Sequence, residues 1–545
     1  MKKIKTMTIF GTRPEAIKLA PVIDGLKQSP NFESVLVTTG QHREMLGQAL
    51  DQFGITPDYN LGIMQPGQAV ADVTVDSLRG VEEIISGEKP DLVLVQGDTT
   101  SAFAGSLAAF YQKVEIGHVE AGLRTYDKYR PFPEEINRSL ITQLSDIHFV
   151  PTPTAWECLR REGIPDSCIF ITGNTVIDSL FHVIKPDYKF ANQTLRKIGD
   201  DCRLLVVTAH RRENFGRPLK EICAGVLEIT QRFPDVVVVF SVHSNPKVNL
   251  PVRGMLGAAP RIHLVEPLDY ADMANLLSRS YLVLTDSGGL QEEAPALAKP
   301  VLVLRDRTER PEAVQAGMAK LIGTSSKAIV SNTSKLLSDA GSYSVMSQGL
   351  SPFGDGKAAG RIINAIEFLH KMRPKRPSPF LSIMPKPVTD DGVIDDRPMS
   401  NDLFYMQLDE MIEKARQERQ TVSIATFDFS LGDRDQFTRA VRAITRGLRE
   451  TDTATAVEGI EGKRLVLVLP GAGKQEAKIA VQRLQGHLAK SFGGRRAGDR
   501  TLGGLRADLI DNLERQLKIE IKTFGSGKET GQDASGQLRA GRKNT

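Results

Sequence analysis

Short runs of consecutive apolar residues alternate with longer stretches of helical periodicity between residues 5 and about 370. Ten of these runs are rich in β-branched residues and are interpreted as strands: 7–10, 34–38, 92–96, 114–118, 148–150, 204–208, 236–239, 262–264, 282–284 and 301–304. Continuously apolar strands separated by helices are what a parallel sheet covered on both faces requires. The pattern predicts an α/β fold of the doubly wound type.

The alternation pauses between about 172 and 202, where polar and aromatic residues replace it before a new strand begins at Leu204. We therefore expect two Rossmann-like lobes, 1–172 and 173–372, with the last helix of the second lobe packing back on the first. Two such sheets would face each other across a cleft at the carboxyl ends of their strands, where folds of this kind bind ligands.

Residues 373–401 are rich in proline and charge without a regular period, and we interpret them as a linker. A smaller α+β domain is predicted at 402–524, and a disordered tail rich in Gly, Ser, Gln, Lys and Arg at 525–545. The elements expected in the smaller domain are helices at 402–419, 437–450 and 475–488 and strands at 421–428 and 464–469.

Composition narrows the class of protein. A length of 545 residues exceeds one hydrophobic core, and a net charge of +4 gives no reason to expect a nucleic-acid partner. There is no apolar run long enough to cross a membrane, and the N-terminal apolar run ends at Phe10, too early for a signal peptide. The four cysteines lack metal-site spacing, so we expect them to be buried and reduced, in a cytoplasmic protein without a metal.

Two glycine-containing turns are candidate anion sites. Gly11 directly follows the first strand, and free backbone N–H groups at the next helix, with Arg13 and Lys18, would favour a phosphate. In the second lobe, Ser287, Gly288 and Gly289 form a similar turn, and a carboxylate in the following helix could bind ribose hydroxyls. Each turn could instead serve packing alone, but together they favour a nucleoside diphosphate.

Carboxylates gather where strands should end. Asp98, Glu120 and the pair Glu134 and Glu135 are candidate acids and bases for proton transfer beside a sugar oxygen. The structural alternative is that Asp98 caps a helix and that Glu134 pairs with Arg138 on a helix face.

Basic residues after the first strand of the second lobe point to a leaving group. His210 and the arginines that follow it would stabilise the charge that develops on a departing diphosphate, although His210 could also be a packed histidine. His118 and His148 lie in or beside apolar runs and are interpreted as structural. The segment 470–475 resembles part of a P-loop, but it lacks the required spacing and is assigned no nucleotide.

Nine motifs over residues 4–372 together resemble the non-hydrolysing UDP-N-acetylglucosamine 2-epimerases: FGTRPEAIK, TGQH, GDTTSAFAG, HVEAGLRT, PFPEEINR, TAHRRENFG, TDSGGLQEEA, RTERPEA and SPFGDGKAAGRI. The resemblance implies two Rossmann-like lobes of the GT-B type, a homodimer, and no NAD or metal. It implies anti elimination of UDP to give 2-acetamidoglucal, followed by re-addition of UDP after protonation from the opposite face. The product, UDP-N-acetylmannosamine, would serve a surface polysaccharide.

The resemblance also assigns site residues. It implies catalytic roles for Asp98, Glu120 and Glu134, with Lys18 and His210 at the same site. The residues it implies for holding UDP are Arg13, His210, Ser287, Gly288, Gly289, Glu293 and Arg310. An activating second substrate molecule would meet Gln41, Gln68, Arg211 and His243, although the basic residue expected before Gln68 is Gly67 here.

The C-terminal domain resembles a degenerate GGDEF domain, through 424–428 and 449–452 followed by 465–470. The signature turn is replaced by 458–463, so no cyclase activity is expected, and the domain would dimerise or sense a ligand. For the first 372 residues, two alternatives stay open: a hydrolysing epimerase that releases N-acetylmannosamine, and a UDP-sugar sensor with its output through the C-terminal domain. A glycosyltransferase explains the three carboxylates less well.

Overall fold

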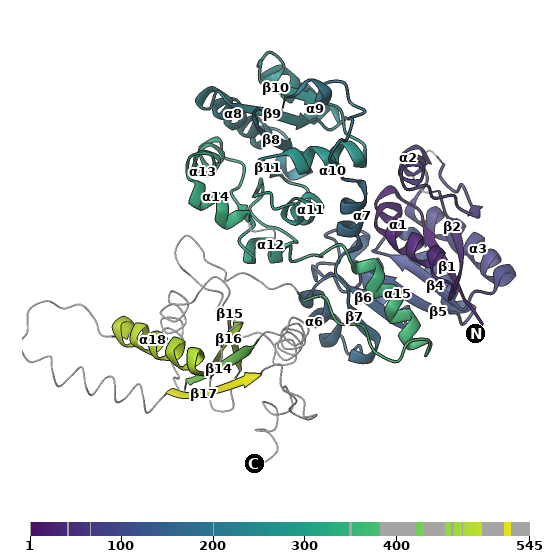
Figure 1. Cartoon of the computed structure of the whole chain (residues 1–545). Coiled ribbons are helices and arrows are strands. Elements are labelled where there is room, and N and C mark those ends of the chain that lie inside the picture. Colours follow the sequence, from purple (N-terminus) through teal and green to yellow (C-terminus); the bar gives the residue numbers. More distant parts are fainter. Residues whose placement is uncertain are drawn as a thin grey trace, which may run out of the picture. The chain divides into compact units, whose positions relative to one another are not determined.

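The computed structural model describes residues 2–40, 43–65, 67–199, 201–347, 351–381, 421–429, 453–458, 463–470, 472, 474–492 and 517–524. The chain divides into two compact units, Met1–Ile383 and Met384–Thr545, which are described separately (Figure 1).

The first lobe is built on a seven-stranded parallel sheet. Its strands, in spatial order, are β3 (Tyr59–Asn60), β2 (Phe32–Thr38), β1 (Ile4–Phe10), β4 (Leu92–Gln96), β5 (Glu115–Val119), β6 (Ile147–Val150) and β7 (Ile169–Ile171). Its helices are α1 (Arg13–Gln28), α2 (Arg43–Phe53), α3 (Val70–Glu88), α4 (Thr100–Tyr111), α5 (Glu134–Leu144) and α6 (Pro153–Arg161), with a 3-10 turn at Asp166–Cys168. Neighbouring parallel strands end at one edge of the sheet, which brings the loops after β4 and β5 together.

The second lobe repeats this plan with six parallel strands. In spatial order they are β10 (Ile262–Val265), β9 (Val236–Ser241), β8 (Arg203–Thr208), β11 (Leu282–Thr285), β12 (Val301–Val303) and β13 (Ala319–Leu321). The helices from 173 onward are α7 (Thr175–Val183), α8 (Arg217–Arg232), α9 (Pro246–Leu256), α10 (Tyr270–Arg279), α11 (Leu290–Ala296), α12 (Pro311–Gln315), α13 (Ser326–Ser338), α14 (Ala340–Met346) and α15 (Ala358–Leu369). Two 3-10 turns lie at Leu195–Lys197 and Arg212–Asn214. The doubly wound α/β fold predicted from the sequence is confirmed.

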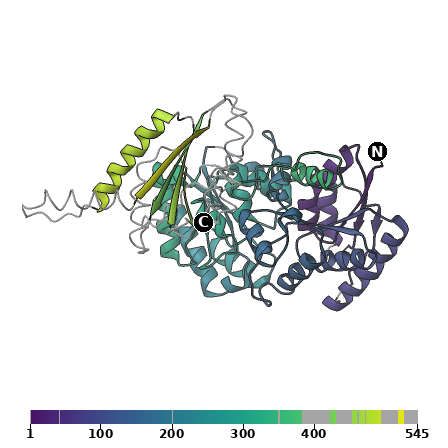
Figure 2. The ribbon, with the colours of Figure 1, turned by 90° about the horizontal axis from the view of Figure 1, so that it is seen from below.

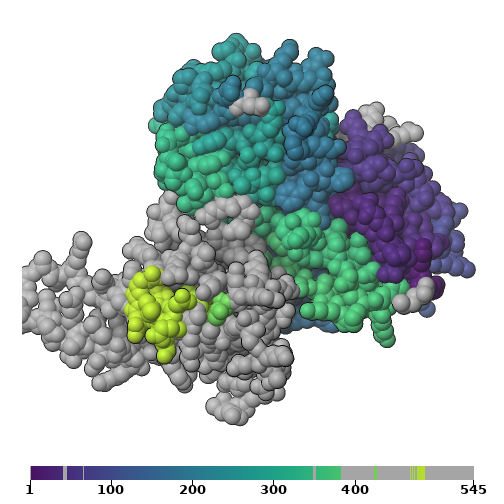
Figure 3. All heavy atoms as spheres, in the orientation of Figure 1, coloured from purple at the N-terminus to yellow at the C-terminus, as the bar shows by residue number. Residues whose placement is uncertain are grey.

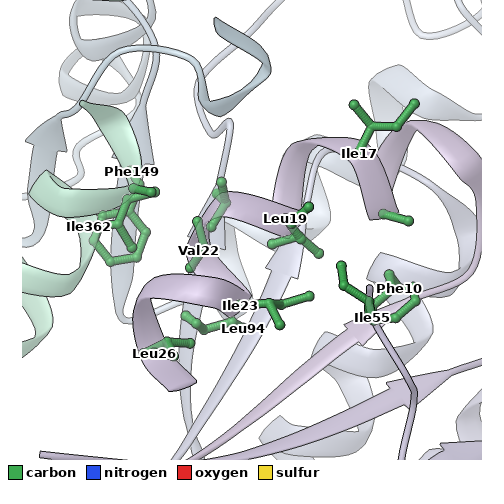
Figure 4. Close-up of a cluster of buried hydrophobic side chains, with 14 of the residues drawn as sticks. Phe10, Ile17, Leu19, Val22, Ile23, Leu26, Ile55, Leu94, Phe149 and Ile362 are labelled. Carbon is green, nitrogen blue, oxygen red and sulfur yellow. The ribbon is translucent and has the colours of Figure 1, made fainter. Parts of the chain in front are cut away.

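The last helix, α15, completes the core of the first lobe. Its buried residues Ile362 and Ile366 share a hydrophobic cluster with Leu19 and Val22 of α1. Gly25 of α1 lies so close to this helix that an added Cβ would stand 2.3 Å from Ile363 Cδ1. Figure 4 shows Ile362 beside Phe149, and Figures 2 and 3 show α15 against the N-terminal elements. Residues more than 330 positions apart are therefore packed in one core.

An acidic residue of α7 caps α15. Asp178 accepts hydrogen bonds from the backbone N–H groups of Ala358, at 3.1 Å, and Ala359, at 2.9 Å. An acceptor at the first turn of a helix satisfies donors that have no partner within the helix. Since α7 also packs against α1, α10 and α11, it connects the helices of both lobes.

The first residues of the expected linker are bound to the first lobe. The Arg376 guanidinium lies 4.2 Å from the centre of the Phe170 ring and donates to three carbonyl groups, those of Asp166, Ser167 and Ile169. Phe380 is 6% exposed, and its N–H donates to Ile171 O at 2.7 Å. We call residues 373–381 the strap. The rest of the expected linker, 382–401, lies outside the described residues.

The described part of the C-terminal unit is a four-stranded antiparallel sheet with one helix. Its strands, in spatial order, are β15 (Thr453–Glu458), β16 (Lys463–Pro470), β14 (Val422–Phe429) and β17 (Leu517–Phe524), and the helix is α18 (Lys474–Phe492). The strands expected at 421–428 and 464–469 and the helix expected at 475–488 are present. The helices expected at 402–419 and 437–450 and the tail at 525–545 lie outside the described residues.

Several details differ from the sequence-based expectations. Strands β3, β7 and β13 have two or three residues each, too few to show a period, and α7 lies within the segment interpreted as a pause. None of the four cysteines forms a disulfide, but only Cys223 is buried, so the expectation of four buried thiols was wrong. Across the described ranges, no helix combines the length and the apolar character that crossing a bilayer would demand.

Candidate active site

Two acidic residues follow neighbouring strands at the carboxyl edge of the first sheet. Asp98 follows β4 and Glu120 follows β5, and these strands are neighbours. A Cβ added to Gly97 would lie 3.5 Å from Glu120 Oε2, so the Glu120 carboxylate reaches the loop that carries Asp98. Glu120 itself adopts a left-handed φ of 62°, an uncommon conformation that turns the chain directly after the strand.

Glu120 is buried yet ionised. Lys18 Nζ lies 2.6 Å and 2.7 Å from its two carboxylate oxygens, which also accept hydrogen bonds from the amides of Gln96 and Asn174. Burial acts to raise the pKa of Glu120, but the attraction of Lys18 and these donors outweighs burial, and the pKa lies below its usual range. A charged carboxylate is thus held at the centre of the site.

Asp98 and Glu134 differ in their partners. Arg138 Nε donates to Asp98 Oδ2 at 3.0 Å, and Arg138 Nη1 donates to Glu135 Oε2 at 3.1 Å. Both structural alternatives for these carboxylates are wrong, because Thr99 caps α4 and Arg138 does not pair with Glu134. Glu134 Oε2 is buried and accepts no hydrogen bond from any described residue. Glu134 therefore has an acceptor atom available for another molecule.

The second lobe contributes one cation, Arg310, to this centre. Arg310 donates through Nε to Glu292, and Asn174 Nδ2 donates to Glu292 at 2.7 Å and to Glu120 at 2.9 Å. Burial acts to lower the pKa of Arg310, but Glu292 and Glu120 raise it by more, so the pKa lies above its usual value and the guanidinium stays charged. Carboxylates and cations of both lobes form one connected group, which we call the central cluster: Lys18, Glu120, Asn174, Glu292 and Arg310.

Glu293 lies beside the central cluster and titrates near neutrality. The residue is only 7% exposed, and burial raises its pKa to about 7, against the opposing influence of Tyr270, Lys18 and Arg13. Near pH 7 it can both donate and accept a hydrogen bond, which suits recognition of a hydroxyl pair. The Arg13 guanidinium lies at the same junction and donates to Leu268 O at 3.4 Å.

A second group forms around Asp286, at the carboxyl edge of the second sheet. The backbone N–H groups of His210 and Arg211 donate to its Oδ2 at 2.9 Å and 2.8 Å, and His210 Nδ1 lies 3.0 Å from its Oδ1. Although burial acts to raise the pKa of Asp286, these donors hold it below its usual value. The rings of His210 and His243 are stacked, with 6.1 Å between their centres. The carboxylate fixes Nδ1 of His210, which leaves Nε2 for a ligand.

The glycine turns differ from their prediction in one respect. The N–H groups of Gly11 and Thr12 donate to Glu15 Oε2 at 3.1 Å and 2.8 Å, so the backbone of the first turn is occupied by an internal carboxylate. Lys18 is likewise turned to Glu120. The expected phosphate site on the first turn was therefore wrong for its backbone groups. In the second turn, Arg211 lies beside the glycine pair: a Cβ added to Gly288 would lie 3.8 Å from Arg211 Nη2.

The residues expected for an activator are only partly gathered. Arg211 and His243 flank His210, whereas Gln68 donates to Asp76 of α3 at 3.0 Å, and Gln41 lies outside the described residues.

His118 and His148 are buried, with pKa values lowered mainly by burial to about 3 and about 4, as expected for structural histidines. Within the described ranges, no group of three His, Cys, Asp or Glu side chains is arranged to hold a metal ion.

Four residues of the site had no role assigned from the sequence: Gln96, Asn174, Asp286 and Glu292. Arg138 was considered only as a partner of Glu134. Asp286 and Glu292 stand within the motif that contains Ser287, so their spacing could have indicated them. Asn174 follows β7, a strand of three residues, and gave no signal. Its place becomes evident only when the two lobes are assembled.

Comparison with known proteins gives a consistent result. Residues 24–367 match the protein family described as UDP-N-acetylglucosamine 2-epimerase. The UDP-N-acetylglucosamine 2-epimerase of Bacillus subtilis (strain 168) is 48% identical over 380 residues, which are 70% of this chain and 99% of the relative. The enzyme of the same name from Escherichia coli (strain K12) is 49% identical over 372 residues, 67% of this chain and 98% of the relative.

Solved structures agree in fold. The S. aureus MnaA-UDP co-structure has a TM-score of 0.63 and 47% identity, and covers 70% of this chain and 100% of that chain. The UDP-GlcNAc 2-epimerase from Neisseria meningitidis bound to UDP-GlcNAc has a TM-score of 0.62 and 45% identity, and covers 68% of this chain and 100% of that chain.

Proposed function

The chain belongs to the UDP-N-acetylglucosamine 2-epimerase family and is an isomerase, and we propose that it inverts C2 of UDP-N-acetylglucosamine by eliminating UDP and adding it back. The C2 proton is removed while the bond between C1 and the UDP oxygen breaks, which gives 2-acetamidoglucal and UDP. Protonation of C2 from the opposite face and return of UDP to C1 give UDP-N-acetylmannosamine. No atom is gained or lost overall.

The observation that carries this proposal is the meeting of a first-lobe carboxylate, Glu120, with a second-lobe cation, Arg310. Glu120 is ionised and can accept a proton, and Glu134 has a buried carboxylate oxygen without a described donor. Asp98 stands at the same sheet edge, where it is paired with Arg138. Two proton-transferring groups on opposite faces of the sugar are what inversion at C2 requires. We assign Asp98, Glu120 and Glu134 as the catalytic carboxylates, with Lys18 beside Glu120.

The second lobe would hold the UDP leaving group. Arg310 and His210 supply positive or donor groups, and Ser287, Gly288 and Gly289 form the turn beside Arg211. Donors fixed before the reaction lower the barrier to charge developing on a leaving group. Arg13 and Glu293 stand together at the junction and would contact the rest of the nucleotide, with Glu293 on the ribose hydroxyls.

The decisive experiment is proton NMR of the full-length protein with UDP-N-acetylglucosamine in D2O, without added NAD or metal. UDP-N-acetylmannosamine carrying deuterium at C2 is expected. Free N-acetylmannosamine with UDP would instead identify a hydrolysing enzyme. Binding without any product would identify a sensor.

Glu120→Gln tests the role of the central carboxylate. Glutamine keeps the shape but loses the charge, so turnover is expected to fall by about 10²–10⁴-fold, the usual contribution of an acid–base group. Calorimetry should find UDP binding close to that of the wild type. Loss of UDP binding would contradict the assignment of Glu120 to proton transfer.

We also propose that the chain forms a homodimer through the first lobe. Adjacent helices α4 and α5 expose large apolar residues, with Phe110 at 53%, Tyr111 at 57%, Ile136 at 42% and Leu140 at 43% exposure. Clustered exposed apolar side chains are typical of an association surface. Light scattering of Phe110→Glu and Leu140→Glu should give monomers where the wild type gives dimers; unchanged dimers would exclude this surface.

For the C-terminal unit we propose a degenerate GGDEF-like domain of regulatory or dimerising type. The spatial order of its strands, β15, β16, β14, β17, supports this proposal, because a β-α-β-β-α-β unit has this order. The helix α18 lies between the third and fourth strands along the chain, as in such a unit.

We propose further that the product of the epimerase supplies N-acetylmannosamine units for a surface polysaccharide. Deletion of the gene, followed by sugar analysis of the cell surface, tests that role.

A further inference from the structure

A single buried amide joins carboxylates of the two lobes. Asn174 Nδ2 donates to Glu120 Oε1 at 2.9 Å and to Glu292 Oε2 at 2.7 Å. Asn174 is 2% exposed and Glu292 is 3% exposed. One NH2 group has two hydrogens, and here each is used on a carboxylate from a different lobe.

The Asn174 side chain is fixed on its other side. The side-chain Oδ1 of Asn174 accepts a hydrogen bond from Val176 N at 3.2 Å. The backbone N–H of Asn174 donates to Phe353 O at 2.6 Å. Any rotation of the amide would leave a buried polar group without its partner, which is costly. The two hydrogens of Nδ2 are therefore held in place.

The charges along the bridge are arranged symmetrically about Asn174. Lys18 is paired with Glu120 and Arg310 with Glu292, and the neutral Asn174 stands between the two carboxylates. An aspartate at this position would place three carboxylates in contact without a hydrogen between them. Asparagine, by contrast, attracts both carboxylates without changing the charge of the site.

We propose that Asn174 and Glu292 are positioning residues for the epimerisation, an inference that rests on the function proposed above. Asn174 aims the Glu120 carboxylate, and Glu292 aims the Arg310 guanidinium. Because the bridge spans both lobes, Asn174 contacts both carboxylates only when Glu292 of the second lobe stands opposite Glu120. The bridge thereby links the proton-transfer group to the arrival of the groups that hold UDP.

The first test compares two buried asparagines. Asn275 is 3% exposed, but its amide bonds only backbone groups: it donates to Val183 O and Ala271 O and accepts from Lys185 N. Both Asn174→Ser and Asn275→Ser should lower the melting temperature. Only Asn174→Ser should reduce kcat, by about tenfold or more, with KM changed less than about threefold, as expected when a transition-state interaction is lost.

The second test uses two isosteric variants with opposite expected effects. The charged groups around Glu120 are Lys18 from α1 and Arg310 from the second lobe, with Glu292 and Glu293 beside them, while His118 behind it is neutral. Asn174→Asp adds a negative charge, which should raise the pKa of Glu120. The acidic limb of the pH profile of kcat should therefore move to higher pH. Glu292→Gln removes a negative charge and should move that limb to lower pH, while the oxygen of the new amide can still accept from Asn174.

Opposite movements of the acidic limb, together with the selective loss of kcat, are the expected result, because a general loss of folding cannot produce them. An unchanged limb in both variants, or a kcat of Asn174→Ser equal to that of Asn275→Ser, would overturn the inference. A wild-type protein that fails to invert C2 would overturn the proposed function instead, so the two failures are distinguishable.

Discussion

His210 Nδ1 lies 3.0 Å from Asp286 Oδ1, and the same carboxylate accepts the backbone N–H groups of His210 and Arg211. Asp286 thus orients the histidine ring and the loop that carries it. A carboxylate in this position fixes the tautomer of the ring and leaves Nε2 exposed to a ligand.

Asp286→Asn should therefore weaken catalysis without unfolding the protein. The neutral amide retains an acceptor oxygen but loses the charge that orients His210, so kcat/KM should fall by about 10–100-fold, as for loss of an orienting partner. Steady-state kinetics with UDP-N-acetylglucosamine measures the effect. Asp339→Asn, at the exposed N-terminus of α14, is the control and should keep wild-type kinetics. Equal activities of the two variants would contradict the orienting role.

The cap on α15 should make stability depend on pH. Burial outweighs the two backbone donors and raises the pKa of Asp178 to about 6, from 3.8 in an unfolded chain. Because the pKa of Asp178 is higher in the folded protein than in the unfolded chain, its contribution to the free energy of unfolding is complete below about pH 4. This contribution is lost as the pH rises through about 6. Asp178→Asn, which does not titrate, should gain about 2 kcal/mol relative to the wild type between pH 4 and pH 7.

Denaturant unfolding followed by fluorescence checks this expectation. Trp156 is the only tryptophan and is 4% exposed in α6 of the first lobe, whose core includes α15. Asp24→Asn, on the exposed face of α1, is the control. A stability difference from the wild type that stays constant across this pH range would show that Asp178 does not titrate there.

The strap should be part of the first unit rather than a free tether. Phe380→Ala removes a buried ring that lies against Gly173, and is expected to cost about 3 kcal/mol, whereas Lys375→Ala, at an exposed position of the strap, should be neutral. A chain ending after residue 381 should keep a wild-type melting temperature for the first unit, and one ending after residue 372 should not. Calorimetry distinguishes them, and equal melting temperatures would refute this account.

Gly11 should not tolerate a side chain. An added Cβ would lie 2.2 Å from both Ser101 Oγ and Thr39 Oγ1, two hydroxyls that hydrogen-bond each other at 2.7 Å in the buried interior. Gly11→Ala should destabilise the first lobe by about 3 kcal/mol, within the range for overpacking. Gly47→Ala, in α2 with no atom within 4 Å of the added carbon, should be neutral or slightly stabilising. Thermal unfolding of both variants provides the measurement.

The sequence predicted the elements that carry a long apolar signal. Strands β1 and β8 were found because each contains several consecutive β-branched or large apolar residues, whereas β7 and β13 have only three residues and no detectable period. Asp98 and Glu120 could be proposed from the sequence because acids that follow buried strands are conspicuous, whereas Glu134 begins α5.

Partnerships between distant residues were not predictable in the same way. Lys18 was expected to face a phosphate, but it is bound to Glu120, a residue 102 positions away. The bridge from Asn174 to Glu292 spans 118 positions and depends on how two separate sheets assemble. Nothing in the local sequence of Asn174 encodes that assembly.

The position of α15 also constrains how the protein is made. The core that α15 shares with α1 stays open on the ribosome until residues 358–369 have emerged. At translation rates of ~5–20 residues per second, the interval between the end of β7 and the start of α15 is on the order of 10–40 seconds. During that interval the nascent first lobe exposes the apolar face of α1, so this enzyme should depend on chaperones that bind emerging chains more than a protein whose lobes close in sequence order.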